Sequence, residues 1–142
     1  MKKIFSLLLL ICAVFAFSSV SNVCYAKKKG LSKTEIQTLS DTLDTLTQKV
    51  YANSLFSPAD NNKLLSIKIA LDNAILAGAK PEFAPLYYKV GVLLKLREYN
   101  DDAIDAFQTV LENFADTPLA PRSVKELTKM GVKIQAPGAP VK

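Results

Sequence analysis

Carboxylates are the residues of this 142-residue chain whose grouping could support acid–base or metal chemistry. Asp101, Asp102 and Asp105 lie close together at the start of a predicted helix. Negative charge there complements the partial positive charge of a helix N-terminus, so we interpret the group as structural. Asp72 and Glu82 have no evident partner in the sequence. The carboxylates therefore predict neither a metal site nor an acid–base pair.

Histidine and cysteine, on which many catalytic and metal sites are built, contribute little. The chain has no histidine, which excludes a histidine-based triad and a histidine metal site. Cys12 and Cys24 both lie near the N-terminus and predict neither a zinc site nor a disulfide framework. No nucleophile motif or glycine-rich phosphate loop occurs. We therefore predict a protein that is not an enzyme and that takes no cofactor.

The first 26 residues have the pattern of a secretory signal peptide. Two lysines precede an apolar run over 4–17, which at about 14 residues is short for a membrane-spanning helix. Small residues favour cleavage after Ala26, with Ser21 as the second choice. An uncleaved anchor and lipidation of Cys24 are alternatives, and only these two would bring membrane contact. Export predicts the periplasm or cell envelope of a bacterium, or secretion into the medium.

The net charge of +5 is concentrated in two short runs of lysine. Lys2 and Lys3 belong to the predicted signal peptide, and Lys27, Lys28 and Lys29 account for the remaining excess. The second run lies in a basic stub over 27–32, which is either solvated or in contact with anionic lipid. No basic stripe with interleaved aromatic residues occurs elsewhere, so we expect no nucleic-acid partner.

A capping box, Ser32-Lys33-Thr34-Glu35, predicts the start of a helix. This helix is expected to run to about residue 55, within an N-terminal segment assigned to 33–56. Its apolar residues alternate at spacings of three and four, as in a short coiled-coil seam. They are Ile36, Leu39, Leu43, Leu46 and Val50. The seam either packs on the rest of the chain or joins a second copy in a homo-oligomer.

The region 57–131 predicts four further helices and no strand, so the fold class is all-α. Ser57 followed by Pro58 is a helix start, and this second helix is expected to extend to about residue 77. The third helix is expected over 85–96, because Pro85 disfavours the helical conformation for the residue before it.

The last two predicted helices complete this region. Asn100 is expected to cap the fourth helix. The fifth starts at Thr117-Pro118 or at Pro121, ends near Gly131, and carries an inward-facing apolar stripe. The residues of that stripe are Val124, Leu127 and Met130. The segment 132–142 is predicted to be a disordered tail.

An internal repeat becomes visible when the chain is shifted by 36 residues. The shift aligns 83–85, Phe-Ala-Pro, with 119–121, Leu-Ala-Pro. It also aligns four apolar positions of the second helix with four of the fourth. These pairs are Ile67 with Ala103, Leu71 with Phe107, Ala74 with Val110, and Ile75 with Leu111. A period of this length predicts antiparallel helix hairpins that stack as a short solenoid.

The second hairpin resembles the tetratricopeptide repeat. The residues that carry the resemblance are Tyr87, Val90, Gly91, Leu94, Ala103 and Phe107. The segment 99–121 is similar to the variant found in bacterial envelope proteins, such as assembly lipoproteins of the BamD type and the Tol-Pal-associated coordinator of cell division. The chain departs from the motif by having Tyr87 in place of Trp and Leu94 in place of Tyr. It also has an extra residue before Ala103 and a late proline at Pro118.

The resemblance implies a fold, packing roles and a binding surface. Gly91 and Ala103 would let the two helices of a hairpin approach closely. The first helix of each hairpin would line a groove for a partner's acidic or C-terminal segment. Its residues here would be Tyr88, Val92 and Lys95, extended by Arg122, Lys125 and Lys129. The alternative is that these side chains are ordinary packing and solvated lysines.

These observations together predict a non-catalytic, exported helical-repeat module that binds or scaffolds other proteins in the bacterial cell envelope. One alternative is a structural protein that self-associates through the seam of the 33–56 segment. A second is a membrane-surface protein tethered by its N-terminus.

Overall fold

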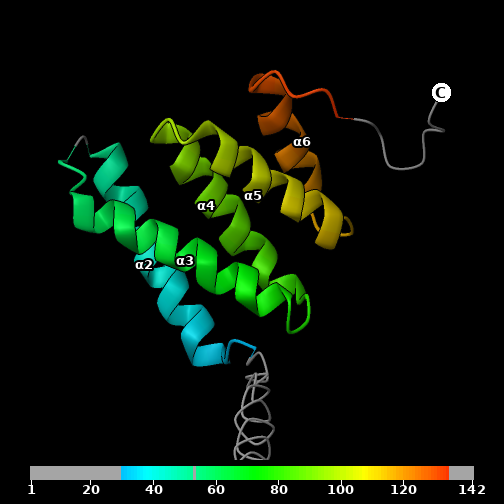
Figure 1. The fold of residues 1–142 in the computed structure, drawn as a ribbon, viewed down its shortest axis with the longest axis horizontal. Helices are drawn as coiled ribbons and strands as arrows, with labels where there is room; N and C mark the ends of the chain where they lie inside the picture. The colour runs from blue at the N-terminus through cyan, green and yellow to red at the C-terminus, as the bar shows by residue number, and fades with distance from the viewer. Residues whose placement is uncertain (1–29, 53, 135–142) are drawn as a thin grey trace, which may run out of the picture.

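The computed structural model describes residues 30–52 and 54–134, which fold into five α-helices and one short 3-10 helix (Figure 1). They are α2 (Lys33–Tyr51), α3 (Pro58–Ile75), η1 (Pro81–Phe83), α4 (Ala84–Leu96), α5 (Asn100–Asn113) and α6 (Ala120–Lys129). The described ranges contain no strand, which confirms the all-α class. The predicted signal peptide over 1–26, the lysine run over 27–29 and most of the predicted tail lie outside the described residues.

Two helix starts follow from local sequence, and both predictions are confirmed. The Ser32 hydroxyl accepts a hydrogen bond from the Glu35 N–H, and the Glu35 carboxylate accepts one from the Ser32 N–H at 2.7 Å. Ser57 and Asp60 form the same reciprocal pair at the start of α3. Each capping box satisfies two backbone donors that a helix leaves without partners.

The ends of three helices share a turn in which the chain reverses direction. The N–H two residues beyond the cap donates to the carbonyl five residues back, as in a Schellman motif. These bonds run from Ser54 to Lys49, from Tyr99 to Leu94, and from Val132 to Leu127. The first ends α2 at Tyr51, short of the predicted residue 55.

The turn after α4 corrects the prediction for the next helix. Glu98 has a φ of 64°, in the left-handed region. This turn makes Tyr99 the N-cap of α5, and Asn100 is the first helical residue with no capping side-chain bond. The predicted Asn100 cap is therefore wrong. The tight reversal brings α5 directly onto α4, and this pair has the most extensive contact in the fold.

The core is centred on α4, which contacts α2, α3, η1 and α5, while α6 packs on α5 (Figure 1). Burial follows the 36-residue shift. Ile67, Leu71 and Ala74 of α3 are buried, and so are their equivalents in α5, namely Ala103, Phe107 and Val110. The helices α4 and α6 begin at the equivalent residues Ala84 and Ala120.

The last helix differs in one respect from its prediction. It begins at Ala120 with Pro121 in its first turn, so of the two predicted starts the later one is closer. Leu127 is fully buried and Met130 is half-buried. Val124 was expected to face inward, but its exposed fraction is 38%. The expectation is wrong because no described helix covers that side of α6.

Candidate functional site

The six residues that carry the repeat resemblance all lie in the core between helices. Tyr87, Val90, Gly91, Leu94, Ala103 and Phe107 are buried. A Cβ atom added to Gly91 would lie 2.8 Å from Cε1 of Phe107. Since Cβ atoms do not tolerate such a distance, the absence of a side chain at Gly91 is what lets α5 approach α4 so closely.

A polar network joins three helices beside this packing. The Tyr87 hydroxyl donates to Asp72 at 2.9 Å, and Lys68 reaches Asp72 at 3.0 Å and Asp105 at 2.6 Å. The interpretation that Asp72 lacks a partner is therefore wrong. Its partners come from α4 and from its own helix, while Lys68 also connects α3 to α5.

The network shifts the proton affinities of its members. Burial, followed by the hydrogen bond to Asp72, raises the pKa of Tyr87. Burial acts to lower the pKa of Lys68, but Asp105 and Asp72 outweigh it and the pKa is raised. The tyrosine therefore stays protonated and the lysine stays charged, which suits a structural tie between helices.

A second ion pair holds the N-terminal helices together. Lys49 of α2 lies 2.9 Å from the carboxylate of Asp60, whose side chain is almost fully buried. The hydrogen bond from Lys49, followed by those from Ser57, lowers the pKa of Asp60 to about 2. The Asp60 carboxylate thus caps the start of α3 and binds Lys49 of α2 at the same time.

The predicted seam of the first helix is occupied within the chain. Leu43 and Leu46 are buried in the core, and the other seam residues, Ile36, Leu39 and Val50, are half-buried against it. Lys89 of α4 also pairs with Asp44 of α2 at 2.6 Å. Association of two chains through this seam would require α2 to leave α4.

The predicted groove on α4 and α6 is partly closed by internal contacts. Lys129 lies 2.7 Å from Glu126, and Lys95 reaches across from α4 to bind the same carboxylate. These contacts, that with Lys129 first, lower the pKa of Glu126, and Glu126 raises the pKa of Lys129. Lys95 therefore ties α4 to α6, while Lys129 pairs with Glu126 within α6.

The remaining predicted groove residues divide into packed and exposed groups. The Tyr88 ring lies 5.7 Å, centroid to centroid, from the ring of Phe107 on α5. Val92 is half-buried against the core. Arg122 and Lys125 are exposed on α6. Neither of these two cations forms an ion pair with the described residues.

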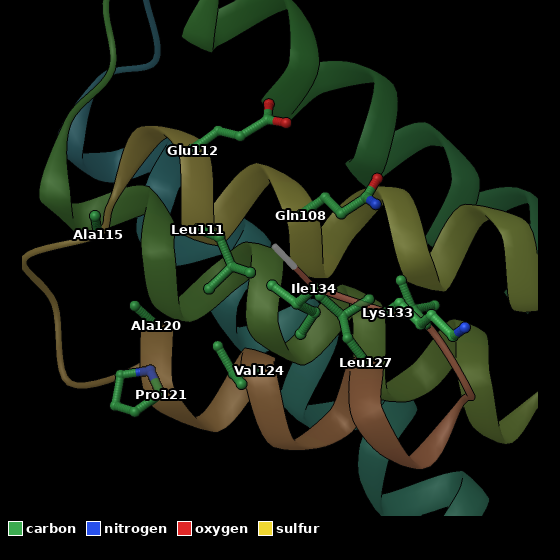
Figure 2. A pocket seen from close by; sticks show the side chains of 11 residues that line it. Gln108, Leu111, Glu112, Ala115, Ala120, Pro121, Val124, Leu127, Lys133 and Ile134 are labelled. Carbon is green, nitrogen blue, oxygen red and sulfur yellow. The ribbon is translucent and has the colours of Figure 1, made fainter. Parts of the chain in front are cut away.

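A groove that the sequence analysis did not anticipate lies between α5 and α6 (Figure 2). Its volume is about 660 Å³. Leu111 of α5, Val124 and Leu127 of α6, and Ile134 beyond α6 point into it (Figure 2). Gln108, Glu112 and Lys133 supply its polar lining. The repeat itself was one available signal for this groove. In the described residues, two helix hairpins precede α6, and no further helix follows α6 to complete a third hairpin.

A smaller recess of about 350 Å³ lies between α2 and α3 and is lined mainly by polar side chains. Thr38, Thr42 and Thr45 line it, and each hydroxyl donates to the backbone carbonyl four residues earlier. These donors are already used within α2. The recess therefore offers a partner fewer free hydrogen-bond donors than its composition suggests.

Comparisons with protein-family models, with curated proteins and with solved structures found no match to this chain. Over 30–52 and 54–134, no helix has the length and apolar character needed to cross a membrane. In the same residues, no group of three or more His, Cys, Asp or Glu side chains is placed to hold a metal ion.

Proposed function

We propose that this chain is an exported, non-catalytic helical-repeat protein that binds or scaffolds other proteins in the cell envelope of a bacterium. Its helices would form a short solenoid of the tetratricopeptide type. The 36-residue shift in burial and the position of Gly91 against Phe107 support that arrangement. The pattern of the first 26 residues supports export.

The observation that carries the proposal is the apolar groove between α5 and α6. An open, contiguous apolar surface with a polar rim is typical of sites where proteins associate. Here the apolar side chains come from two helices and the segment after α6, and the rim carries charges of both signs at Glu112 and Lys133. A partner could bury the apolar part and pair with the charges.

The polar side chains of the fold support a binding role over a catalytic one. Asp60, Asp105 and Glu126 each pair with a lysine of another helix, while Asp72 pairs with Lys68 within α3 and accepts a hydrogen bond from Tyr87 of α4. A carboxylate that is paired in this way is not free to act as a catalytic group. Arg122 and Lys125 remain exposed on α6 and would contribute long-range attraction to an acidic partner, which raises the association rate more than the affinity.

Site-specific photo-crosslinking in the producing cell tests this function. A photoreactive residue is placed in the full chain at Val124, at Lys125, or at Gln37 on the exposed side of α2. We expect an adduct with a different protein from Val124 or Lys125 and none from Gln37. If neither position on α6 yields an adduct, protein binding through this end of the fold is contradicted.

Export is tested separately by fractionating cells and sequencing the N-terminus of the recovered protein. We expect the protein outside the cytoplasm with Lys27 as its first residue, as cleavage after Ala26 would produce. An intact N-terminus in the cytoplasmic fraction would contradict export.

A further inference from the structure

We infer that the α5–α6 groove receives an amphipathic α-helix of a partner protein, lying where the next helix of the repeat would lie. This inference rests on the proposed function, because it names the kind of partner that the module binds. It is carried by the repeat relationship between this groove and one that is filled within the chain.

The filled groove lies between α3 and α4, and its occupant is α5. Tyr88 and Gly91 of α4 both lie against the ring of Phe107 on α5. On the other wall, Lys68 of α3 binds Asp105 of α5. The occupant is therefore held by apolar contact along one helix and by an ion pair to the other.

The 36-residue shift carries this groove onto the open one. It moves α3 onto α5 and α4 onto α6, and it places Val124 and Leu127 at the positions of Tyr88 and Gly91. Both residues line the open groove, as does Gln108, the equivalent of Asp72. Two positions that face α5 in one repeat thus line an open space in the next, whereas the position of Lys68 corresponds to Ile104, which does not line it.

The differences between the two grooves define the chemistry of the occupant. Leu127 stands where Gly91 admits the Phe107 ring, and it is itself fully buried, so the incoming helix must lie farther from α6 and rest on Val124 and the segment 132–134 instead. With α6 ten residues long, the contact spans about 15 Å, or between two and three helical turns. The anchors on the partner are expected at i, i+3 or i+4, and i+7.

Charge sets the orientation of the partner helix. Glu112 on α5 and Lys133 after α6 are exposed at the groove, and neither forms an ion pair with the described residues. A matching helix carries a basic residue toward Glu112 and an acidic residue toward Lys133. A helix with the opposite arrangement would place like charges together and be rejected.

A photoreactive residue at Val124 of the full chain, in the producing cell, tests the inference, with Ile69 as the matched control. Ile69 is an apolar residue on α3 with an exposed fraction of 60%, so it is more accessible than Val124. We expect an adduct from Val124 alone. Mass spectrometry of the adduct should locate the crosslink in a partner segment with helical apolar spacing and the two flanking charges.

A peptide copying that segment then gives a quantitative readout by fluorescence anisotropy. Val124→Glu should weaken peptide binding roughly tenfold or more, because it places an unpaired charge in an apolar contact. Ile69→Glu should change it less than about twofold, since the residue lies outside the groove. Circular dichroism of both variants checks that the chain remains folded, and the peptide should gain helicity when bound.

Several results would overturn the inference. These are no adduct at Val124, a crosslink to a second copy or to residues 135–142 of the same chain, and a partner segment without helical spacing. An adduct from Lys125 but none from Val124 would leave the proposed function standing while this inference fails. Absence of adducts from both positions would reject both.

Discussion

The two ends of the helical array differ in what they offer to another molecule. At the N-terminal end, the recess between α2 and α3 is lined by threonines whose hydroxyls already donate within α2, and by the Lys49–Asp60 pair. At the C-terminal end, the recess between α5 and α6 has about twice the volume, and its lining is mainly apolar. Repeat arrays need a polar outer face where stacking stops. In the described residues, the recess at the N-terminal end is polar, although Tyr51 at the end of α2 and Leu55 after it are exposed, whereas the recess at the C-terminal end is mainly apolar.

The largest expected effect comes from substituting one apolar residue at each end. Leu43→Ala should destabilise the fold by about 2–5 kcal/mol, because the Leu43 side chain on α2 is fully buried in the core. Val124→Ala should cost less than about 1 kcal/mol, since that side chain is already partly in water. Urea unfolding of both variants measures the difference. Equal losses at the two positions would mean that the C-terminal groove is closed in solution.

Gly91→Ala tests the close approach that exists at α4 but not at α6. The new methyl group would meet the buried Phe107 ring at 2.8 Å, so we expect a loss of about 1–3 kcal/mol despite the better helix propensity of alanine. Thermal unfolding followed by circular dichroism gives the change. Combining it with Phe107→Leu should recover part of the loss, and strictly additive losses would show that the two residues do not collide.

Low pH should weaken the contact between α2 and α3. A carboxylate whose pKa is lowered by folding stabilises the native state above its ordinary pKa, and this stabilisation is lost as pH falls toward the folded value. For Asp60 the interval runs from about 3.8 down to about 2. Urea unfolding between pH 5 and pH 2 should therefore show falling stability, and Asp60→Asn should flatten that dependence. An unchanged slope in the variant would rule out Asp60 as the titrating group.

Glu98→Gly should have the smallest effect, and its sign is positive. Glu98 adopts a left-handed φ of 64°, which costs a residue with a side chain roughly 1 kcal/mol. Glycine removes that cost but gives the unfolded chain more freedom, so we expect a gain of about 0.5 kcal/mol. The midpoint of thermal unfolding measures it, with Glu98→Ala as the control that should bring no gain. A glycine variant less stable than wild type would show that the glutamate side chain stabilises the turn.

Helix boundaries could be predicted from the sequence where they depend on contacts between residues close together in the chain. The capping boxes at Ser32 and Ser57 depend on residues three positions apart, and both helix starts were predicted correctly. The Asn100 cap was predicted wrongly because the reversal at Glu98 moves the boundary by one residue. A glutamate with a left-handed φ is strained, and the local sequence pattern does not predict it.

The candidate site could be predicted only in part, for a related reason. Position in the motif brought Lys95 and Lys129 to the same face, but it could not reveal that Glu126 binds both. Likewise, helical spacing placed Val124 on the apolar side of α6, yet its burial depends on a neighbour that the described residues do not provide. The groove is a property of which helices surround it, and periodicity within one helix does not contain that information.

The asymmetry between the two ends has a consequence for stoichiometry. A module with complementary surfaces at both ends can propagate into a filament, since each added copy recreates the site that it fills. Among the described residues, the threonine-lined side of α2 is polar and does not match the mainly apolar hollow beside α6. Copies of this chain are therefore not expected to add to one another through these two surfaces, and a partner that fills the hollow should give a one-to-one complex.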